Sequence, residues 1–327
     1  AIGIGGTGFS ALSALKQNVY ERIKQDNYAR RDIEAPEYER IQFLQIDSDQ
    51  QSGSAFNTSE FFYIGAEDIL KLLAGTKAKN EPQFKWLNKN TSIDTARQGA
   101  GGVRQIGKLL LQGQASRLKE KISGIIRNGI KDLKENFTVN IYIMAGIGGG
   151  TGSGCFIDVC YIVRQALADL GHDGDAFISG FFFLPDVNLA SDNFPQLDVY
   201  KNMVKENGYA ALQELDYLMG IPENGGRYKQ QYGPQFTIDM EVSPVTQNLC
   251  HLISTTAIDG TVRRNGYNYV MHATAEYILN YLVEAKANSQ NNQLDASVTI
   301  QGLLPNLGTL VGGTIKDYGV NYKYSII

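Results

Sequence analysis

Residues 144–155 read MAGIGGGTGSGC, and five of the seven positions from Gly148 to Gly154 are glycine. Every glycine gives the unfolded backbone conformational freedom that folding removes, so a cluster of glycines needs a compensating reason. The usual reason is a ligand that the main chain approaches more closely than a Cβ atom would allow. This run therefore predicts a loop that binds a ligand.

The segments on either side of the run predict the kind of ligand. VNIYIMAG (139–146) is β-branched and aromatic, as in a buried strand, and CFIDVCYIVRQALADLG (155–171) has the pattern of a helix that ends at Gly171. A glycine turn between a strand and a helix directs several backbone N–H groups and the positive end of the helix toward one point. Such a point binds anions, and phosphate is the most common of them.

Strands and helices alternate along the remaining chain. Further strands are expected at residues 1–4, 41–49, 176–186 and 249–257. Further helices are expected at residues 9–25, 66–74, 103–135, 199–220 and 267–287, and a hairpin or extended excursion at 222–248. Because the strands are apolar throughout and alternate with helices, the fold class is predicted to be α/β, with a Rossmann-like parallel sheet that helices cover on both faces.

The composition is that of an ordinary globular protein, with 43% hydrophobic and 20% charged residues among 327. A formal net charge of −4 argues against nucleic acid as the main partner, because binding to a phosphate backbone requires a surplus of Lys and Arg. The longest nearly continuous apolar run, AFISGFFFLP (176–185), is too short to cross a bilayer, and no signal peptide is visible. The chain opens on Ala1-Ile2 within a predicted strand, which favours an N-terminus upstream. We expect a cytoplasmic protein without a transmembrane segment.

The cysteines and histidines predict neither disulfides nor a metal held by the protein alone. Three cysteines are too few and too dispersed for a disulfide framework, and three histidines make no metal-ligand spacing with them. These residues are Cys155, Cys160, Cys250, His172, His251 and His272. We expect Cys155 and Cys160 to be small core residues on the helix that follows the glycine run.

A second glycine loop occurs near the N-terminus in a similar strand–loop–helix setting. Gly3, Gly5 and Gly8 formally match the dinucleotide fingerprint G-x-G-x-x-G. That fingerprint expects an acidic residue about 20 residues later to hold a ribose. Asp47 and Asp49 end the second predicted strand, but they lie roughly twice as far along the chain. A nicotinamide or flavin oxidoreductase is therefore an alternative, although it gives no account of the longer glycine run.

Residues 102–108 nearly match the Walker loop G-x-x-x-x-G-K-[S/T], but Leu109 replaces the metal-binding hydroxyl and no strand precedes the match. We treat this match as a coincidence. The run at 148–154 contains no lysine. Phosphates bound there would be held by amides, by the hydroxyls of Thr151 and Ser153, and by the end of the helix.

The strand, the GGGTGSG run at 148–154 and the following helix resemble the signature of the tubulin/FtsZ superfamily of GTPases. Other segments resemble that superfamily in the same order. GIGGTGFSAL (3–12) is similar to its first phosphate loop, and FLQIDSDQQ (43–51) is similar to its second strand. GAGG (99–102) sits where the family has its γ-phosphate-sensing loop, and FFFLPDVN (181–188) resembles the strand and proline loop that border the ribose.

The later part of the chain extends this resemblance. The helix from about Tyr267 resembles the central helix that joins the two domains of the family, while YAALQELDYLM (209–219) and the closing YGV…YSI stretch look closest to bacterial tubulin-like proteins. The resemblance implies a GTP-binding domain over residues 1–265 and a central helix over 266–287. Residues 288–327 would then be a reduced C-terminal domain or the start of a truncated one.

The resemblance also implies an activity. A protein of this kind would bind GTP or GDP with Mg²⁺, assemble head to tail into filaments by self-association, and complete GTP hydrolysis across the interface between subunits. The nucleotide contacts that it implies are at Gly5, Gly6, Thr7, Ser10, Asp47, Asp49, Gly99, Gly101, Gly102, Gly148, Gly149, Gly150, Thr151, Gly152, Ser153, Pro185, Asp186, Asp259 and Tyr269.

Two departures from the family pattern concern recognition of the base and hydrolysis. Ser10 occupies the position where FtsZ carries an asparagine that contacts the base. The activating loop of the family, G-x-x-N-x-D, is represented only by NNQLD, with Asn292 and Asp295. Asp295 is the candidate for the acid that polarises water, while Arg97 and Arg104 flank the third loop and could reach a γ-phosphate. A scaffold that binds nucleotide without hydrolysing it is therefore an alternative to a GTPase.

Overall fold

The main element of the fold is a seven-stranded sheet in the order β3-β2-β1-β4-β5-β8-β9, in which every neighbouring pair is parallel. The computed structural model describes residues 1–29, 40–65, 84–88, 91, 99–133, 137–192, 194–195, 197–257, 260–289 and 325–326. The strands of the sheet are β1 (Ile2–Ile4), β2 (Leu44–Asp47), β3 (Phe61–Tyr63), β4 (Val139–Gly146), β5 (Ala176–Phe183), β8 (Cys250–Ile253) and β9 (Ser325–Ile326), and a separate hairpin contains β6 (Tyr228–Gly233) and β7 (Phe236–Met240). The predicted α/β class with a parallel sheet is confirmed.

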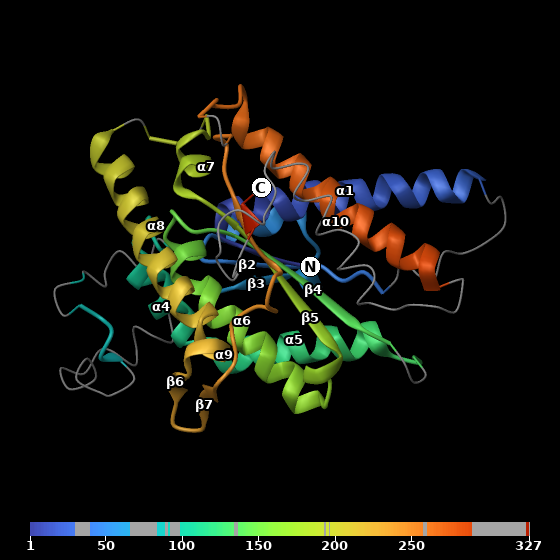
Figure 1. The fold of residues 1–327 in the computed structure, drawn as a ribbon, viewed down its shortest axis with the longest axis horizontal. Coiled ribbons are helices and arrows are strands. Elements are labelled where there is room, and N and C mark those ends of the chain that lie inside the picture. The colour runs from blue at the N-terminus through green and yellow to red at the C-terminus, as the bar shows by residue number, and fades with distance from the viewer. Residues whose placement is uncertain are drawn as a thin grey trace.

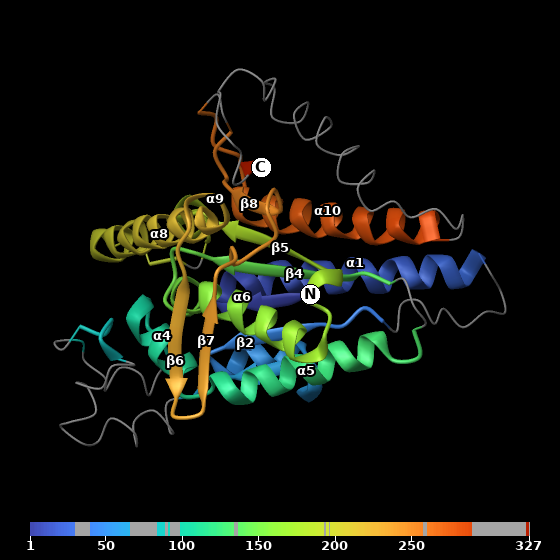
Figure 2. The ribbon, with the colours of Figure 1, turned by 60° about the horizontal axis from the view of Figure 1, so that its bottom comes forward.

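Helices cover both faces of the sheet (Figures 1 and 2). On one face, α1 (Gly5–Ala29) packs against α10 (Gly266–Ser289) over an apolar cluster. The other face carries α4 (Arg104–Gln112), α5 (Ala115–Ile130) and α6 (Thr151–Leu170), with α8 (Asp198–Met219) against α6. The short helical segments are η1 (Gln50–Ala55), η2 (Thr58–Glu60), η6 (Asp173–Asp175), α7 (Pro185–Leu189) and α9 (Ile221–Asn224).

The β6–β7 hairpin is the excursion that the composition of residues 222–248 predicts, and aromatic side chains attach it to α6. The ring of Tyr228 stacks on Tyr161 with the centroids 3.7 Å apart. The hydroxyls of Tyr228 and Tyr232 donate to the buried carboxylate of Asp158 at 2.9 and 2.7 Å. The hairpin is therefore part of the folded domain.

Three local features differ from the sequence prediction. The helix expected at 103–135 is broken into α4 and α5 at Gly113. At the end of α4, the side chain of Gln112 donates a hydrogen bond to the carbonyl of Gln231 in the hairpin, at 2.6 Å. The first helix begins at Gly5, inside the glycine loop. β3 was not predicted, because three residues are too few to show alternation. The predicted helix at 66–74 and most of the region at 288–327 lie outside the described residues.

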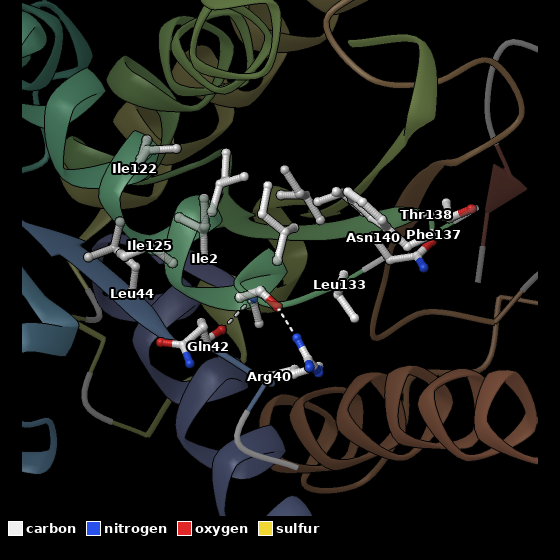
Figure 3. A pocket seen from close by; sticks show the side chains of 16 residues that line it. Ile2, Arg40, Gln42, Leu44, Ile122, Ile125, Leu133, Phe137, Thr138 and Asn140 are labelled. Carbon is white, nitrogen blue, oxygen red and sulfur yellow. Dashed lines mark hydrogen bonds between the residues drawn. The ribbon is translucent and has the colours of Figure 1, made fainter. Parts of the chain in front are cut away.

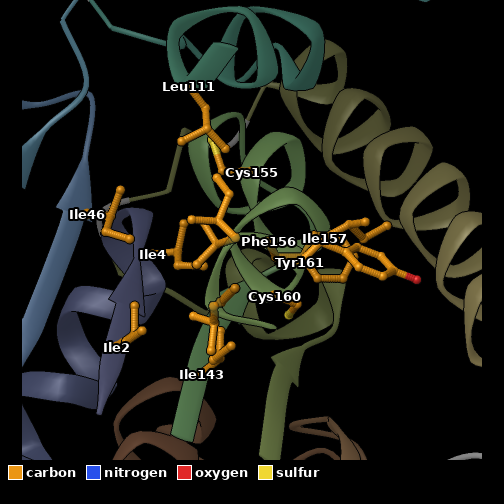
Figure 4. Close-up of a cluster of buried hydrophobic side chains, with 14 of the residues drawn as sticks. Ile2, Ile4, Ile46, Leu111, Ile143, Cys155, Phe156, Ile157, Cys160 and Tyr161 are labelled. Atoms are coloured by element: carbon orange, nitrogen blue, oxygen red, sulfur yellow. The ribbon is translucent and has the colours of Figure 1, made fainter. Parts of the chain in front are cut away.

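Figure 4 shows how α6 covers the sheet. Phe156 inserts between the helix and the strands, and its ring meets Phe182 of β5 edge to face with the centroids 4.9 Å apart. Cys155 and Cys160 on the same helix are fully buried. Burial raises the pKa of the Cys160 thiol to about 12, so this thiol stays protonated at neutral pH. Both cysteines are core residues, as expected.

His251 on β8 is a buried titratable residue on the opposite face of the sheet. Its side chain stacks on Phe181, with the ring centroids 4.7 Å apart, and meets the ring of Tyr277 edge to face at 5.7 Å. Burial disfavours the charged imidazolium, which lowers the pKa of His251 from the ordinary value of 6.5 to about 4.

We expect His251 to make the protein less stable in acid. Because the folded-state pKa is depressed, the unfolded chain binds the proton first, so stability falls as the pH drops from 6.5 toward 4. At about 1.4 kcal/mol per pH unit, the loss reaches roughly 3 kcal/mol. Urea unfolding of the wild type and of His251→Phe at pH 7 and pH 4.5 measures it. The variant keeps an aromatic ring and should lose less stability in acid; an equal loss in both proteins would contradict the assignment.

Candidate nucleotide-binding site

Two glycine loops meet at the carboxyl edge of the sheet. β1 and β4 are parallel neighbours, so the turns that follow them emerge side by side. Gly5, with a φ of +68°, adopts a left-handed conformation that favours glycine, and a Cβ atom on it would lie 2.9 Å from the amide nitrogen of Gly152. The main chains of the two loops are therefore in contact. The glycine loops at residues 3–8 and 148–154 thus form one structural unit at this edge of the sheet.

A cavity of about 350 Å³ opens between these loops. The end of β2 and the third glycine loop complete its wall. The lining residues are Ile4, Gly5, Gly6, Thr7, Asp47, Ser48, Asp49, Ser52, Gly99, Ala100, Gly101, Gly102, Gly146, Gly149, Gly150, Thr151, Gly152 and Asn188. The structure thus brings most of the sequence-predicted contacts to one place, although they come from four separate segments of the chain.

The third loop, residues 99–102, is held against the other two by Ser48. Its three glycines have φ values of +90°, +56° and +80°, a conformation that other residues rarely adopt. The Ser48 hydroxyl accepts a hydrogen bond from the amide of Ala100 at 3.1 Å and shares one with the Thr151 hydroxyl at 2.7 Å. One buried side chain at the end of β2 therefore joins the second and third loops.

The cavity has the donors of an anion site without a cationic side chain. No lysine or arginine is among the described residues that line it. α1 and α6 both begin at its wall, so their unpaired first-turn amides and positive dipole ends face it. The hydroxyls of Thr7, Ser48, Ser52 and Thr151 add further donors. Backbone amides and hydroxyls can hold phosphate in this way.

Two carboxylates at the end of β2 give the same cavity a place for a cation. Asp47 is 3% exposed, and its Oδ1 accepts hydrogen bonds from the amides of Ser48 at 2.7 Å and Asp49 at 3.3 Å. Burial, its largest influence, raises the pKa of Asp47, so its ionised form needs compensation by positive charge. Mg²⁺ commonly binds one or two carboxylates together with substrate phosphates. The carboxylates of Asp47 and Asp49 therefore suit Mg²⁺ that binds together with a polyphosphate.

The glycines of the run at 148–154 have two different roles. A Cβ atom on Gly149 would meet nothing within 4 Å, so this position borders open cavity. A Cβ on Gly152 would lie 2.3 Å from the carbonyl oxygen of Gly146, and one on Gly154 would lie 2.1 Å from the carbonyl oxygen of Arg104. Gly149 therefore borders the cavity, Gly154 allows close packing against α4, and Gly152 lines the cavity while it also packs against the main chain.

Three predicted residues lie behind the second loop and do not line the cavity. The Ser153 hydroxyl accepts from Arg104 Nε at 3.2 Å and lies 3.4 Å from the Asn207 carbonyl oxygen, so it faces α4 and α8. Arg104 itself forms a bidentate pair with Glu214 of α8 at 2.7 and 2.8 Å. Gly148 packs beside Val204. These contacts differ from the expected phosphate contacts because α8 approaches the loop from outside.

Four other predicted residues also lie outside the cavity wall. Asp186 holds the turn after β8, where its Oδ2 accepts from the amide and the hydroxyl of Thr255 at 2.7 and 2.8 Å. Pro185 begins α7. The Ser10 hydroxyl accepts from Tyr267 at 2.9 Å. Tyr269 is 49% exposed, and the guanidinium of Arg263 lies 4.8 Å from its ring centroid. Arg97, Asp259, Asn292 and Asp295 lie outside the described residues.

Ser48, Ser52 and Asn188 line the cavity but were not singled out in the sequence. Asn188, on α7, donates from Nδ2 to the Thr7 hydroxyl at 3.1 Å, and its buried Oδ1 has no hydrogen-bond partner among the described residues. This oxygen lies on the side of Gly148, where a Cβ atom would come within 2.8 Å of it. These residues could have been predicted from their position in the sequence, because each follows a strand that ends at the same edge of the sheet.

A second cavity, of about 210 Å³, lies at the opposite ends of β1 and β4 (Figure 3). Isoleucines of α5, including Ile122 and Ile125, form much of its wall, and Leu44 lies next to Ile125. It contains neither glycine loop and no helix N-terminus. Its apolar lining does not suit a phosphate, so the cavity between the loops is the better candidate for a nucleotide.

Among the described residues, no helix is long and apolar enough to cross a membrane. The same part of the chain contains no group of three His, Cys, Asp or Glu residues that could hold a metal ion without a ligand.

Known proteins share both the sequence pattern and the fold of this chain. The sequence model of a family described as "Tubulin like" matches residues 1–305. Among solved structures, CetZ2 from Haloferax volcanii, described as a "GTPgS bound protofilament", is similar with a TM-score of 0.50 and 15% sequence identity. The match covers 92% of this chain and 61% of that chain, so this chain spans about three-fifths of its length. At that identity the likeness concerns the fold alone. No curated protein matches the sequence.

Proposed function

This chain belongs to the tubulin-like family, and on that premise we propose that it binds GTP or GDP with Mg²⁺ in the cavity between its three glycine loops. The observation that carries the proposal is the contact between the first two loops, which aims the amino ends of α1 and α6 at one cavity. A single glycine loop, as in a nicotinamide or flavin enzyme, would leave the second and third loops without a function.

The described residues suggest how the phosphates would be held. First-turn amides of α1 and α6 would donate to the phosphate oxygens, assisted by Thr7 and Thr151. Asp47 and Asp49 would hold Mg²⁺ directly or through water, and this ion would supply the positive charge that the protein lacks there.

We further propose that the protein assembles head to tail and that hydrolysis is completed between subunits. A contact between two different surfaces builds an open filament when the rotation between successive subunits does not close a ring. The carboxylates among the described residues that line the cavity are those of Asp47 and Asp49, which this proposal assigns to Mg²⁺. An acid supplied by the next subunit would then orient the attacking water. Asp295, the candidate for that acid, lies outside the described residues and stays a prediction, as does a cytoplasmic location.

Phosphate release measured against protein concentration tests this proposal. If catalysis is shared across an interface, the rate per subunit should rise steeply with concentration in GTP, and electron microscopy of the same samples should show filaments. ATP serves as the control nucleotide. Filaments that form with GTP but release no phosphate would favour the scaffold that binds nucleotide without hydrolysing it. A rate per subunit that does not change with concentration would contradict catalysis in trans.

A further inference from the structure

The inner face of α8 contacts the glycine loops from outside the cavity. Met203, Val204 and Asn207 lie along this face. A Cβ atom on Gly102 would lie 2.3 Å from Cε of Met203, and one on Gly148 would lie 2.7 Å from Cγ1 of Val204. None of the three side chains lines the cavity. The helix is therefore in a position to control the loops without touching what they bind.

Asn207 makes the most specific of these contacts. Its side chain is 8% exposed, and its Nδ2 donates to the carbonyl oxygen of Gly102 at 2.7 Å and to that of Gly148 at 2.9 Å. One amide group thus uses both of its N–H bonds to join the third glycine loop to the second. Both carbonyls belong to loops whose other groups form the cavity wall.

The third loop has few other attachments of this kind. It contains three glycines with positive φ, and glycine offers the backbone many alternative conformations. Ser48 holds the loop through the amide of Ala100. Asn207 holds it through the carbonyl of Gly102. These two side chains hold different residues of the loop, so the removal of either one leaves the loop with one side-chain attachment fewer.

We infer that Asn207 is a positioning residue that sets the spacing between the second and third glycine loops, and thereby the affinity of the cavity for a nucleoside triphosphate. This inference rests on the proposed function, because it concerns the same cavity. The side chain acts through the carbonyls of Gly102 and Gly148 and makes no contact with the ligand. Pre-organised amides bind more tightly than amides that must be ordered at the moment of binding.

Asn207→Leu tests the inference, since leucine is close in size and has no donor. Asn202→Leu is the matched control, because Asn202 is exposed on the same helix. Isothermal titration with the slowly hydrolysed analogue GTPγS and Mg²⁺ at 25 °C, with thermal unfolding measured in parallel, should show affinity about tenfold lower for Asn207→Leu and unchanged for Asn202→Leu. A merely structural role would lower Tm without changing the affinity of the folded protein.

The outcomes separate the inference from the proposed function. Wild-type protein that does not bind GTPγS would contradict the proposed function itself. Wild-type binding together with less than about a threefold loss in folded Asn207→Leu would overturn the inference alone. If Asn207→Leu does not fold, Asn207→Ala is tested in the same way. Failure of both variants to fold would also overturn the inference, because the side chain would then stabilise the domain as a whole.

Discussion

Gly149→Val is expected to abolish binding of GTP while leaving the protein folded. A Cβ atom on Gly149 would meet no protein atom within 4 Å, and the residue has no positive φ, so a side chain here starts in open space and the fold should be retained. The same open space is the cavity between the loops. The two γ-methyl groups would therefore occupy space that the phosphates need. We expect the affinity for GTP to fall by at least about a hundredfold.

Gly174→Val is the matched control for this variant. Gly174 also has open space around it and lies in η6, between α6 and the amino end of β5, away from the loops. Titration with a fluorescent GTP analogue, with circular dichroism to verify folding, compares both variants with the wild type. The control should bind normally. Folded Gly149→Val that keeps micromolar affinity would show that the cavity beside this residue is not the phosphate site.

Gly154→Ala, five residues further along the same run, is expected to have the opposite effect: a large loss of stability. Its Cβ atom would lie 2.1 Å from the carbonyl oxygen of Arg104 and 2.8 Å from the amide nitrogen of Lys108, both on the main chain of α4. Backbone atoms cannot rotate out of the way, so α4 would have to move away from α6. We expect the free energy of unfolding to fall by about 3 kcal/mol or more.

Gly124→Ala provides a control with the opposite sign. Gly124 lies within α5, and a Cβ atom on it would meet nothing within 4 Å. Alanine within a helix is better than glycine by roughly 0.5–1 kcal/mol where its Cβ meets no neighbour, so this variant should be slightly more stable than the wild type. Urea unfolding of the nucleotide-free protein measures both changes. A Gly154→Ala variant as stable as the wild type would mean that α4 and α6 do not pack as closely as described.

These two variants show what could and could not be predicted from the sequence. The strand at 139–146 was predicted with its bounds, because a continuous apolar β-branched stretch followed by glycines has few other interpretations. The convergence of the two loops followed from parallel topology, since strands of one parallel sheet end at the same edge. The two roles within the glycine run could not be predicted. They depend on α4, which precedes the run by some 40 residues and contacts Gly154 only in the folded chain.

The contributions of Ser48 and Asn207 illustrate the same limit. Ser48 is one polar residue after a strand, and nothing near it in sequence indicates that its hydroxyl joins Ala100 to Thr151. Asn207 sits within a helix whose sequence resembles an ordinary amphipathic one. Its two carbonyl partners lie about 60 and 105 residues earlier in the chain. Side-chain contacts over such separations arise from tertiary packing, which local patterns do not encode.

The most direct test of the central claim is an experimental structure of the protein with GTPγS and Mg²⁺. The central claim is that bare main chain from two loops, without lysine or arginine, holds the phosphates. The account predicts phosphate density between residues 5–7 and 149–152, with the metal on the side of Asp47 and Asp49. Phosphates held elsewhere on the molecule, or an empty cavity at saturating nucleotide, would contradict it.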